Sequence, residues 1–296
     1  MKKKIKSILL KLSGFFLGEL ISGQNKIIKF QIISNCLSKG SVAAASRTID
    51  ATNPISWEFS AFSQNCEDGI IDYLTKKIKN PNKYFIEIGA STGVECNTAY
   101  LAYVQKFSGL MIDGSERAIE YAKSINHSLG VSYHSLFVTI DNIEKIRQLS
   151  LYHNPDLFSW DTDGNDYYFI NKLFDLGFRP KIFVVEYNSA FGPDKKITIQ
   201  YDENFYINTA HSTALYYGCS IALWKQLFEE KKYTFVTVDS NGVNAFFIDN
   251  TQFDIDFIQN IKGKDFIENF YQYNKFKCSW ENQFELIKEL PYFTIA

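Results

Sequence analysis

Between residues 62 and 250, short apolar runs alternate with stretches of helical spacing, and this alternation constrains the fold more than any other feature. A run such as Tyr84–Ile88, closed by Gly89, is typical of a strand buried on both faces of a parallel sheet. Parallel strands need long crossover connections, usually helical, so the alternation predicts a doubly wound α/β sheet. The predicted strands are residues 84–88, 109–113, 131–138, 157–160 and 181–186, and the predicted helices include residues 66–77, 116–125 and 167–176.

The pattern changes near the end of this region. Residues 233–238 and 243–248 form two further apolar runs, joined by Ser240-Asn241-Gly242. Asn-Gly readily supplies the positive φ angles of a tight turn, so these runs should pair as an antiparallel hairpin. We therefore predict a Rossmann-like, mostly parallel sheet closed by a C-terminal hairpin.

The 296 residues fit one large domain with extensions better than two full domains. We expect a helical N-terminal extension at 1–60, the Rossmann-like domain at 61–250 and a helical tail at 251–296. Nothing in the sequence fixes the oligomeric state.

Charge and cysteine content exclude several classes of protein. The 31 Lys+Arg and 33 Asp+Glu residues give a net charge of −2, so the chain as a whole has no electrostatic attraction to nucleic acid. The five cysteines are scattered and contain no C-x-x-C, which argues against both a disulfide framework and a zinc site. Such cysteines are typical of a reducing compartment, and we expect a cytoplasmic protein.

The N-terminus is basic and then apolar. Residues 1–6 carry four lysines, but Lys11 and Glu19 interrupt the apolar run that follows, which is too short and too charged to span a bilayer. We expect an amphipathic helix packed on the domain. The alternative is peripheral contact with the inner face of a membrane, where the lysines would meet anionic lipid.

Acidic and small residues follow the predicted strands at the point where each strand ends. Ligands of open parallel sheets bind outside these carboxyl ends, at the crevice where the strand order reverses. The candidate residues at these ends are Glu87, Gly89, Ser91, Gly93, Asp113, Gly114, Ser115, Asp161, Asp163 and Glu186.

The first two strand ends suggest a nucleoside. Gly89 and Gly93 allow a sharp turn and a close backbone approach, and Asp113 is placed to accept hydrogen bonds from a ribose diol. The G-x-G-x-x-G spacing that cradles a pyrophosphate is absent, because Ser91-Thr92 replaces it. The pattern favours a nucleoside without phosphates over a dinucleotide.

These motifs resemble those of class I S-adenosylmethionine-dependent methyltransferases, and in particular the FkbM-like group often associated with bacterial surface polysaccharides. The resemblance implies that Glu87, Gly89 and Gly93 border the methionine end of S-adenosyl-L-methionine. It further implies that Asp113 holds the ribose, that Asp161 lies beside the amino group and that Asp163 faces the acceptor. The chain departs from the family at Ser91, near which a further glycine is usual. The stretches that carry the resemblance are residues 63–71, 87–93, 109–115, 161–167, 186–194 and 240–247.

The segment Asp161-x-Asp163-Gly164-x-Asp166 has the acid spacing of a cation loop. The glutamate that completes such a loop is missing and the segment follows a strand, so we predict no metal site. Asp163 can act as a general base or orient a hydroxyl, and Asp166 is explained by capping of the helix that follows.

Two further segments supply candidates for acceptor binding and catalysis. Glu186 is followed by Tyr187 and Phe191, whose rings would suit a carbohydrate. His211 lies in a candidate lid segment; the alternative is an ordinary surface histidine.

The hypothesis we favour is methyl transfer from S-adenosylmethionine to a hydroxyl of a sugar in surface polysaccharide biosynthesis. The catalytic candidates are Asp163, Glu186 and His211. We expect a small-molecule or glycan acceptor as the partner, and we expect no binding of nucleic acid. A non-catalytic glycan- or partner-binding module is the alternative, and a nicotinamide-dependent oxidoreductase has the right architecture but the wrong glycine spacing.

Overall fold

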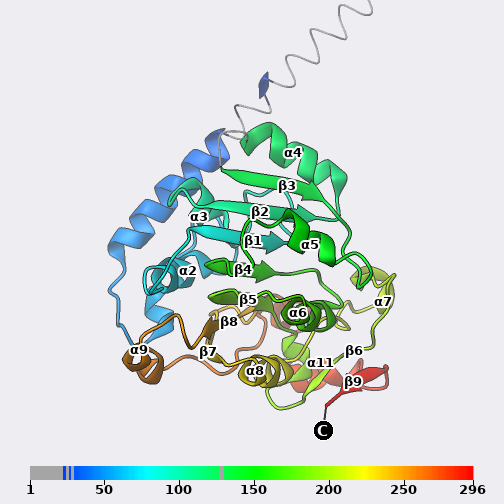
Figure 1. Ribbon diagram of the computed structural model, residues 1–296. Coiled ribbons are helices and arrows are strands. Elements are labelled where there is room, and N and C mark those ends of the chain that lie inside the picture. The colour runs from blue at the N-terminus through cyan, green and yellow to red at the C-terminus, as the bar shows by residue number, and fades with distance from the viewer. Residues whose placement is uncertain (1–22, 25–26, 28–29, 127–129, 296) are drawn as a thin grey trace, which may run out of the picture.

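The computed structural model describes the chain except residues 1–22, 25–26, 28–29, 127–129 and 296, and shows a central sheet between two layers of helices (Figure 1). The seven strands of this sheet lie in the order β3-β2-β1-β4-β5-β8-β7. Their bounds are β1 Tyr84–Ile88, β2 Ser108–Asp113, β3 Val131–Ser135, β4 Leu157–Trp160, β5 Ile182–Glu186, β7 Tyr233–Val238 and β8 Asn244–Asp249.

The strand order reverses beside β1. This strand pairs in parallel with β2 on one side and with β4 on the other, and β4 pairs in parallel with β5. The carboxyl ends of these four strands therefore meet at one edge of the sheet, around a topological switch point. As predicted, β7 and β8 form an antiparallel hairpin, with β8 inserted between β5 and β7. The fold is the predicted Rossmann-like, mostly parallel sheet closed by a hairpin.

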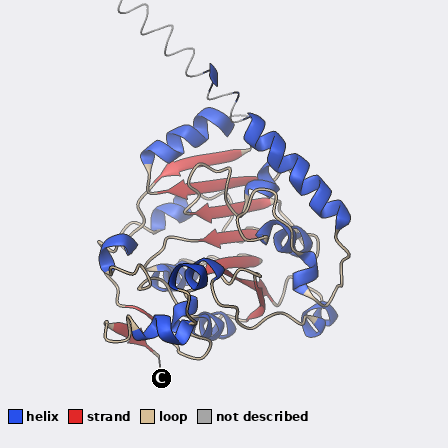
Figure 2. Ribbon diagram, turned by 180° about the vertical axis from the view of Figure 1, so that it is seen from behind, coloured by secondary structure: helices blue, strands red, loops and turns tan. Residues whose placement is uncertain are grey.

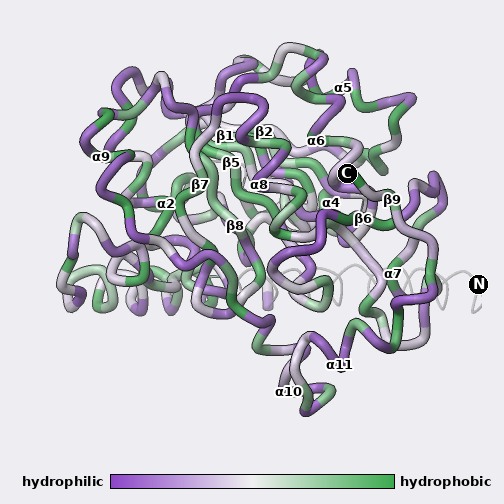
Figure 3. The backbone as a smooth tube through the Cα atoms, turned by 90° about the horizontal axis from the view of Figure 1, so that it is seen from below, coloured by the Kyte–Doolittle hydropathy of each residue, from purple (hydrophilic) through white to green (hydrophobic). Residues whose placement is uncertain are grey.

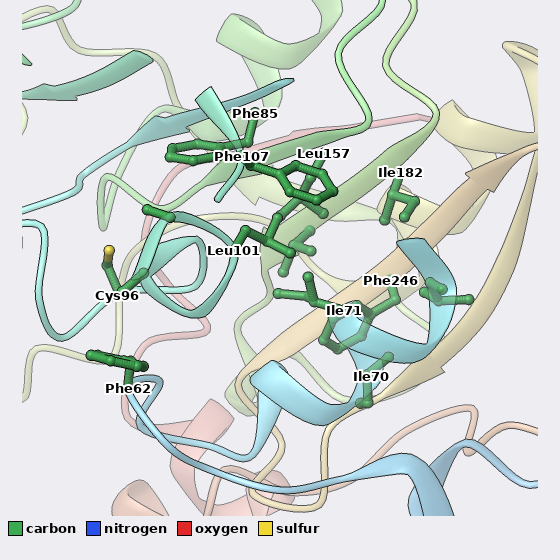
Figure 4. Packing of buried hydrophobic residues seen from close by; sticks show 14 of the residues in the cluster. Phe62, Ile70, Ile71, Phe85, Cys96, Leu101, Phe107, Leu157, Ile182 and Phe246 are labelled. Carbon is green, nitrogen blue, oxygen red and sulfur yellow. The ribbon is translucent and has the colours of Figure 1, made fainter. Parts of the chain in front are cut away.

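Helices cover both faces of the sheet (Figure 2). Because successive strand residues point to opposite faces, Phe85 joins the core cluster on one face and Ile86 the cluster on the other. The first cluster includes residues of α2, α3 and α4, and its packing is shown in Figure 4. The second includes residues of α5, α6 and α8. The bounds are α2 Glu67–Thr75, α3 Ala99–Tyr103, α4 Glu116–Asn126, α5 Glu144–Leu149, α6 Asp166–Asp175 and α8 Ile221–Glu230.

The hydropathy of the chain follows this layering. Strands at the centre of the tube in Figure 3 are mainly hydrophobic, and several outer helices and loops are hydrophilic. Every residue of β1, β4 and β5 is buried, which is why these strands appear as unbroken apolar runs in the sequence.

The C-terminal tail differs from the expectation of helices alone. It contains α9 Ile255–Asn260, α10 Phe270–Phe276 and α11 Trp280–Glu285, but it ends in a strand, β9 Tyr292–Thr294. This strand pairs antiparallel with β6 Ile197–Ile199 in a second, two-stranded sheet. The remaining short elements are η1 Pro54–Trp57, η2 Ser189–Phe191 and α7 Ile207–Ala210.

At the N-terminus, residues 30–46 are helical, and Ile33 and Cys36 pack against the core. The basic segment at 1–21, for which we expect an amphipathic helix, lies outside the described residues. Within the described part of the chain, no helix combines the length and the apolar character needed to cross a bilayer.

Candidate functional site

Two cavities adjoin at the carboxyl ends of the strands. The β2-side cavity, of about 400 Å³, lies over the ends of β1, β2 and β4. The β5-side cavity, of about 370 Å³, lies over the ends of β1, β4 and β5 and the start of β8. Four residues line both cavities and so form their common boundary: Gly89, Ser91, Asp161 and Asp163.

The bend after β1 brings the backbones of β1 and β4 close together. Gly89 has a φ of +84°, and a Cβ at this position would lie 1.8 Å from the carbonyl oxygen of Asp161. Only glycine fits there, because any side chain would collide with backbone. Gly93, which has a φ of +68°, completes the turn, with its amide donating to the carbonyl of Ala90 at 2.8 Å.

Ser91 stands where the resemblance leads one to expect a further glycine. Its φ is +47°, a left-handed conformation that costs a non-glycine residue of the order of 1 kcal/mol. The backbone amide of Ser91 donates to Oδ2 of Asp113 at 2.8 Å. This hydrogen bond holds the loop in a path that a glycine would adopt without strain.

Asp113, at the end of β2, is half-buried and lines the β2-side cavity together with Gly114. Its Oδ1 accepts from the amide of Ser115 at 2.7 Å, and its Oδ2 from Ser91. A carboxylate offers about four lone-pair directions, so two remain for a ligand. The bonds from the two amides fix the carboxylate at the cavity wall.

The remaining walls of the β2-side cavity are largely apolar. Phe137, in the loop after β3, is 59% exposed, and its ring lies 3.3 Å from the position of a Cβ on Gly114. Phe205 comes from the segment before α7 and packs in the same way against Gly164. Neither ring was predicted from the sequence, because neither lies in a strand-end motif.

Three carboxylates converge where the two cavities meet. Asp161 and Asp163 follow β4, Glu186 ends β5, and one carboxylate oxygen of each lies within 4.8 Å of the other two. Burial raises the pKa of Asp161 and of Glu186 well above the usual range, and the negative neighbours raise it further. Burial also raises the pKa of Asp163.

Glu87 lines the β5-side cavity, but its carboxylate is occupied by protein groups. It accepts from the amides of Asn97 at 2.9 Å and Thr98 at 3.0 Å, and from the hydroxyl of Thr98. Burial raises its pKa. Glu87 thus anchors the segment that leads into α3.

A polar network forms the outer wall of the β5-side cavity. Oε1 of buried Glu67 accepts from the side-chain amides of Asn65 at 3.0 Å and Asn244 at 2.7 Å. Asn269 and the ring of Tyr271, which is 52% exposed, also line the cavity. The C-terminal tail therefore contributes to the site, which the sequence analysis did not predict.

Several candidates lie outside the two cavities. Gly93 and Ser115 shape the loops but line neither cavity. The same is true of His211, which follows α7 and whose Nδ1 lies 2.8 Å from the hydroxyl of Thr213. The structure thus does not bring His211 to the carboxylates.

Two expectations about neighbouring side chains are wrong. Tyr187 and Phe191 are 1% and 0% exposed, because the chain stays in the core after β5, so neither ring offers a face to a carbohydrate. Asp166 does not cap α6: its Oδ1 accepts from the indole nitrogen of Trp160 at 3.1 Å and from the hydroxyl of Thr162.

The charges of the site are not balanced. Among the described residues, no lysine, arginine or histidine lines either cavity. The helix N-terminus nearest Asp113 begins with another acid, Glu116. A ligand with phosphate groups would find no cationic partner here, whereas a neutral or cationic ligand needs none.

No protein-family model matches the sequence, and no curated protein matches it. Among solved structures, the O-methyltransferase from Bacillus cereus in complex with SAH is 12% identical, with a TM-score of 0.41 over 74% of this chain and 89% of that one. The SAH-bound methyltransferase PaMTH1 of Podospora anserina is 14% identical, with a TM-score of 0.43 over 71% of this chain and 92% of that one. The N-terminal domain of EvdMO1, in the presence of SAH and D-fucose, is 10% identical, with a TM-score of 0.41 over 64% and 84%.

Proposed function

We propose that this protein is an S-adenosylmethionine-dependent O-methyltransferase of the FkbM-like group that methylates a sugar hydroxyl in surface polysaccharide biosynthesis. The observation that carries the proposal is the pair of adjoining cavities at the switch point of the sheet. One combines Asp113 and other acids with aromatic walls suited to a nucleoside, and the other has polar and acidic walls suited to an acceptor.

The β2-side cavity fits the donor. Asp113 is held at the wall with two lone-pair directions free for ribose hydroxyls, and Phe137 and Phe205 offer apolar faces for a flat base. The lack of cationic side chains disfavours a pyrophosphate and suits a positively charged sulfonium compound. Asp161 and Asp163, on the common boundary, lie where the charged methionine end would meet the acceptor.

When bound, S-adenosylmethionine supplies an electrophilic methyl group: the acceptor oxygen bonds to the methyl carbon, the carbon–sulfur bond breaks with its electron pair on sulfur, and the hydroxyl proton leaves. Such a displacement depends more on alignment than on strong base catalysis. Asp163, the exposed member of the carboxylate cluster, is the group we assign to accept the proton. Buried Glu186 orients the acceptor hydroxyl from the end of β5.

The β5-side cavity suits a polyhydroxylated acceptor. Gln64 lines it with an exposed amide group that can both donate to and accept from hydroxyls, and half-buried Asn97 adds a second amide. Tyr271 adds an exposed ring on which a sugar face can stack. The rings of Tyr187 and Phe191, which we expected to contact the acceptor, are buried, so we assign stacking on the sugar to Tyr271 of the C-terminal tail.

The proposal places the enzyme in the cytoplasm, because five scattered cysteines without a C-x-x-C are typical of a reducing compartment. A cytoplasmic enzyme would act on a soluble sugar or on a glycan precursor before export.

The proposal is tested by calorimetric titration of the full chain with S-adenosylhomocysteine and, separately, with NAD. We expect one site for S-adenosylhomocysteine and no measurable binding of NAD. Absence of S-adenosylhomocysteine binding would contradict the proposal, and binding of NAD would favour the oxidoreductase alternative. Transfer of a radiolabelled methyl group to sugar acceptors distinguishes an enzyme from a binding module, for which the donor would bind without transfer.

A further inference from the structure

Two buried asparagines share one carboxylate in the outer wall of the β5-side cavity. Asn65 and Asn244 are 4% and 3% exposed, and the side-chain amide of each donates to Oε1 of Glu67, at 3.0 Å and 2.7 Å. Oε2 of Glu67 accepts from the backbone amide of Asn65 at 2.6 Å. Three donated hydrogen bonds thus hold this buried carboxylate between the loop before α2 and the start of β8.

The two asparagines differ at their side-chain oxygens. Oδ1 of Asn65 accepts from the side-chain amide of Asn241 at 3.1 Å, so both ends of this side chain are bound by protein groups. Oδ1 of Asn244 is buried and has no hydrogen-bond partner among the described residues, although Asn244 lines the cavity. A buried acceptor without a partner costs about 1–3 kcal/mol, so we assign Asn65 to the structure of the wall and Asn244 to a ligand.

Glu67 determines which end of the Asn244 amide is left for that ligand. A carboxylate accepts hydrogen bonds and the amide nitrogen donates them, so Nδ2 of Asn244 faces Glu67 and Oδ1 does not. An amide oxygen can only accept a hydrogen bond. The ligand group that meets Asn244 is therefore a hydrogen-bond donor.

This donor would lie beside the groups that we assign to the reaction. Asn244 stands directly opposite Glu186 in the antiparallel register of β5 and β8, so the two side chains emerge on the same face of the sheet. Oε2 of Glu186 is also buried, and no residue in the described part of the chain donates to it. Two unpartnered oxygens on neighbouring strands suit two adjacent hydroxyls of one sugar ring.

We propose that Asn244 accepts a hydrogen bond from the acceptor hydroxyl next to the one that is methylated, and that Glu67 is the positioning residue that orients Asn244. The inference rests on the proposed function, in which Glu186 orients the hydroxyl that receives the methyl group. It narrows the acceptor to sugars with a free hydroxyl adjacent to the methylated one. Such a site rejects the analogue without that hydroxyl, because the buried oxygen is then left unpaired.

The test measures transfer of a radiolabelled methyl group from S-adenosylmethionine by the full chain to the methyl pyranosides of glucose, galactose, mannose, rhamnose and fucose. For the sugar with the highest kcat/KM, each hydroxyl next to the methylated one is then removed in turn by use of the deoxy analogue. We expect one deoxy analogue to react with a kcat/KM at least about tenfold lower.

Asn244→Ala should lower kcat/KM for the intact sugar about tenfold and reduce its advantage over that analogue to less than about twofold. Glu67→Gln no longer fixes the direction of the Asn244 amide and should reduce the same advantage, with no further reduction in the double variant. Both variants should bind S-adenosylhomocysteine as the wild type does.

Gln283→Ala is the matched control. The side chain of Gln283 in α11 is 1% exposed, and its Oε1 is likewise buried without a partner among the residues that the structure describes. Gln283 lines neither cavity, so its loss should leave the discrimination between the sugar and the deoxy analogue unchanged.

Equal kcat/KM for the sugar and every deoxy analogue would overturn this inference and leave the proposed methyltransferase intact. Full discrimination in Asn244→Ala, or its loss in Gln283→Ala, would also overturn it. Should Asn244→Ala not fold, Glu67→Gln decides the outcome. Transfer to none of the five pyranosides would overturn the inference together with the sugar acceptor, whereas titration with S-adenosylhomocysteine decides the donor assignment separately.

Discussion

Buried charges are paired with opposite charges at the amino ends of the central strands but not at their carboxyl ends. At the amino ends, Asp156 and Lys181 form an ion pair of 2.6 Å with side chains 0% and 4% exposed, and Arg179 pairs with Asp249, also at 2.6 Å. At the carboxyl ends, Asp161, Asp163 and Glu186 cluster with no basic side chain among the described residues of the cavity walls. The same strands, β4 and β5, connect the two arrangements.

We assign the paired charges at the amino ends to stability and the unpaired acids at the carboxyl ends to function. Asp156 also accepts from the amides of Asn82 at 2.9 Å and Lys83 at 2.8 Å, so its charge is fully compensated within the protein. The carboxyl-end acids are compensated only in part, and their raised pKa values reflect this. Carboxyl groups with raised pKa values that share a cavity are typical of functional sites.

The largest effect is expected at the amino ends. Lys181→Met removes the cation from Asp156 and leaves a buried carboxylate without its partner, which should lower the free energy of unfolding by about 3–5 kcal/mol. Urea denaturation measures the change. Adding Asp156→Asn to this variant should restore part of the loss, because no uncompensated charge then remains.

Glu186→Gln is the matching change at the carboxyl ends. Burial and the neighbouring acids already disfavour the charged form of this carboxyl, so a neutral amide in its place should change the free energy of unfolding by no more than about 1 kcal/mol. A loss as large as that of Lys181→Met would show that Glu186 is as fully compensated as Asp156, and the contrast between the two ends would disappear.

The next effect concerns the donor. Asp113→Ala removes the carboxylate assigned to the ribose and should weaken S-adenosylhomocysteine binding by about 1.5–3 kcal/mol, the usual contribution of hydrogen bonds to a charged group. Calorimetry measures it. Glu120→Gln, an exposed acid on α4, is the charge-matched control and should bind as the wild type does. Unchanged affinity of Asp113→Ala would place the ribose elsewhere.

A smaller effect is expected at the apolar wall. Phe137→Ala removes an exposed ring that lines the β2-side cavity, and should weaken S-adenosylhomocysteine binding by about 0.5–1.5 kcal/mol if the ring stacks on the base. Stability should hardly change, because the ring contributes little to the core. Equal binding by both proteins would remove Phe137 from the donor site.

The smallest effect is expected at Ser91. Ser91→Gly relieves a left-handed conformation and should raise the free energy of unfolding by about 0.5 kcal/mol, after allowing for the greater freedom of glycine in the unfolded chain. Thermal unfolding measures this. A lower stability would mean that the serine side chain contributes more than its backbone strain costs.

The strands could be predicted from the sequence because burial on both faces leaves unbroken apolar runs, as in β1 and β5. The hairpin followed from Asn241-Gly242, and the acids at the strand ends followed from the topology. Helix α3, of five residues, was missed because it is too short to show a helical period. The predicted third strand was three residues too long, since the chain leaves the sheet after Ser135.

The rest of the site depends on contacts between distant segments. Asn244 meets Glu186 only through the register of β8 with β5, and Tyr271 reaches the cavity from a tail that carries no motif. Conversely, Tyr187 and Phe191 were expected to contact a sugar because of their residue type, but both are buried in the structure. Residue type and spacing located the edge of the sheet, and tertiary packing decided which side chains face the cavity.

The central claim, that the carboxyl ends bind a nucleoside while the amino ends only stabilise, is tested most directly by hydrogen–deuterium exchange with and without saturating S-adenosylhomocysteine. We predict slower exchange in residues 89–93, 113–115 and 136–138, and no change in the turns at 79–83 and 153–156. Unchanged exchange throughout, or protection at the amino-end turns instead, would contradict it.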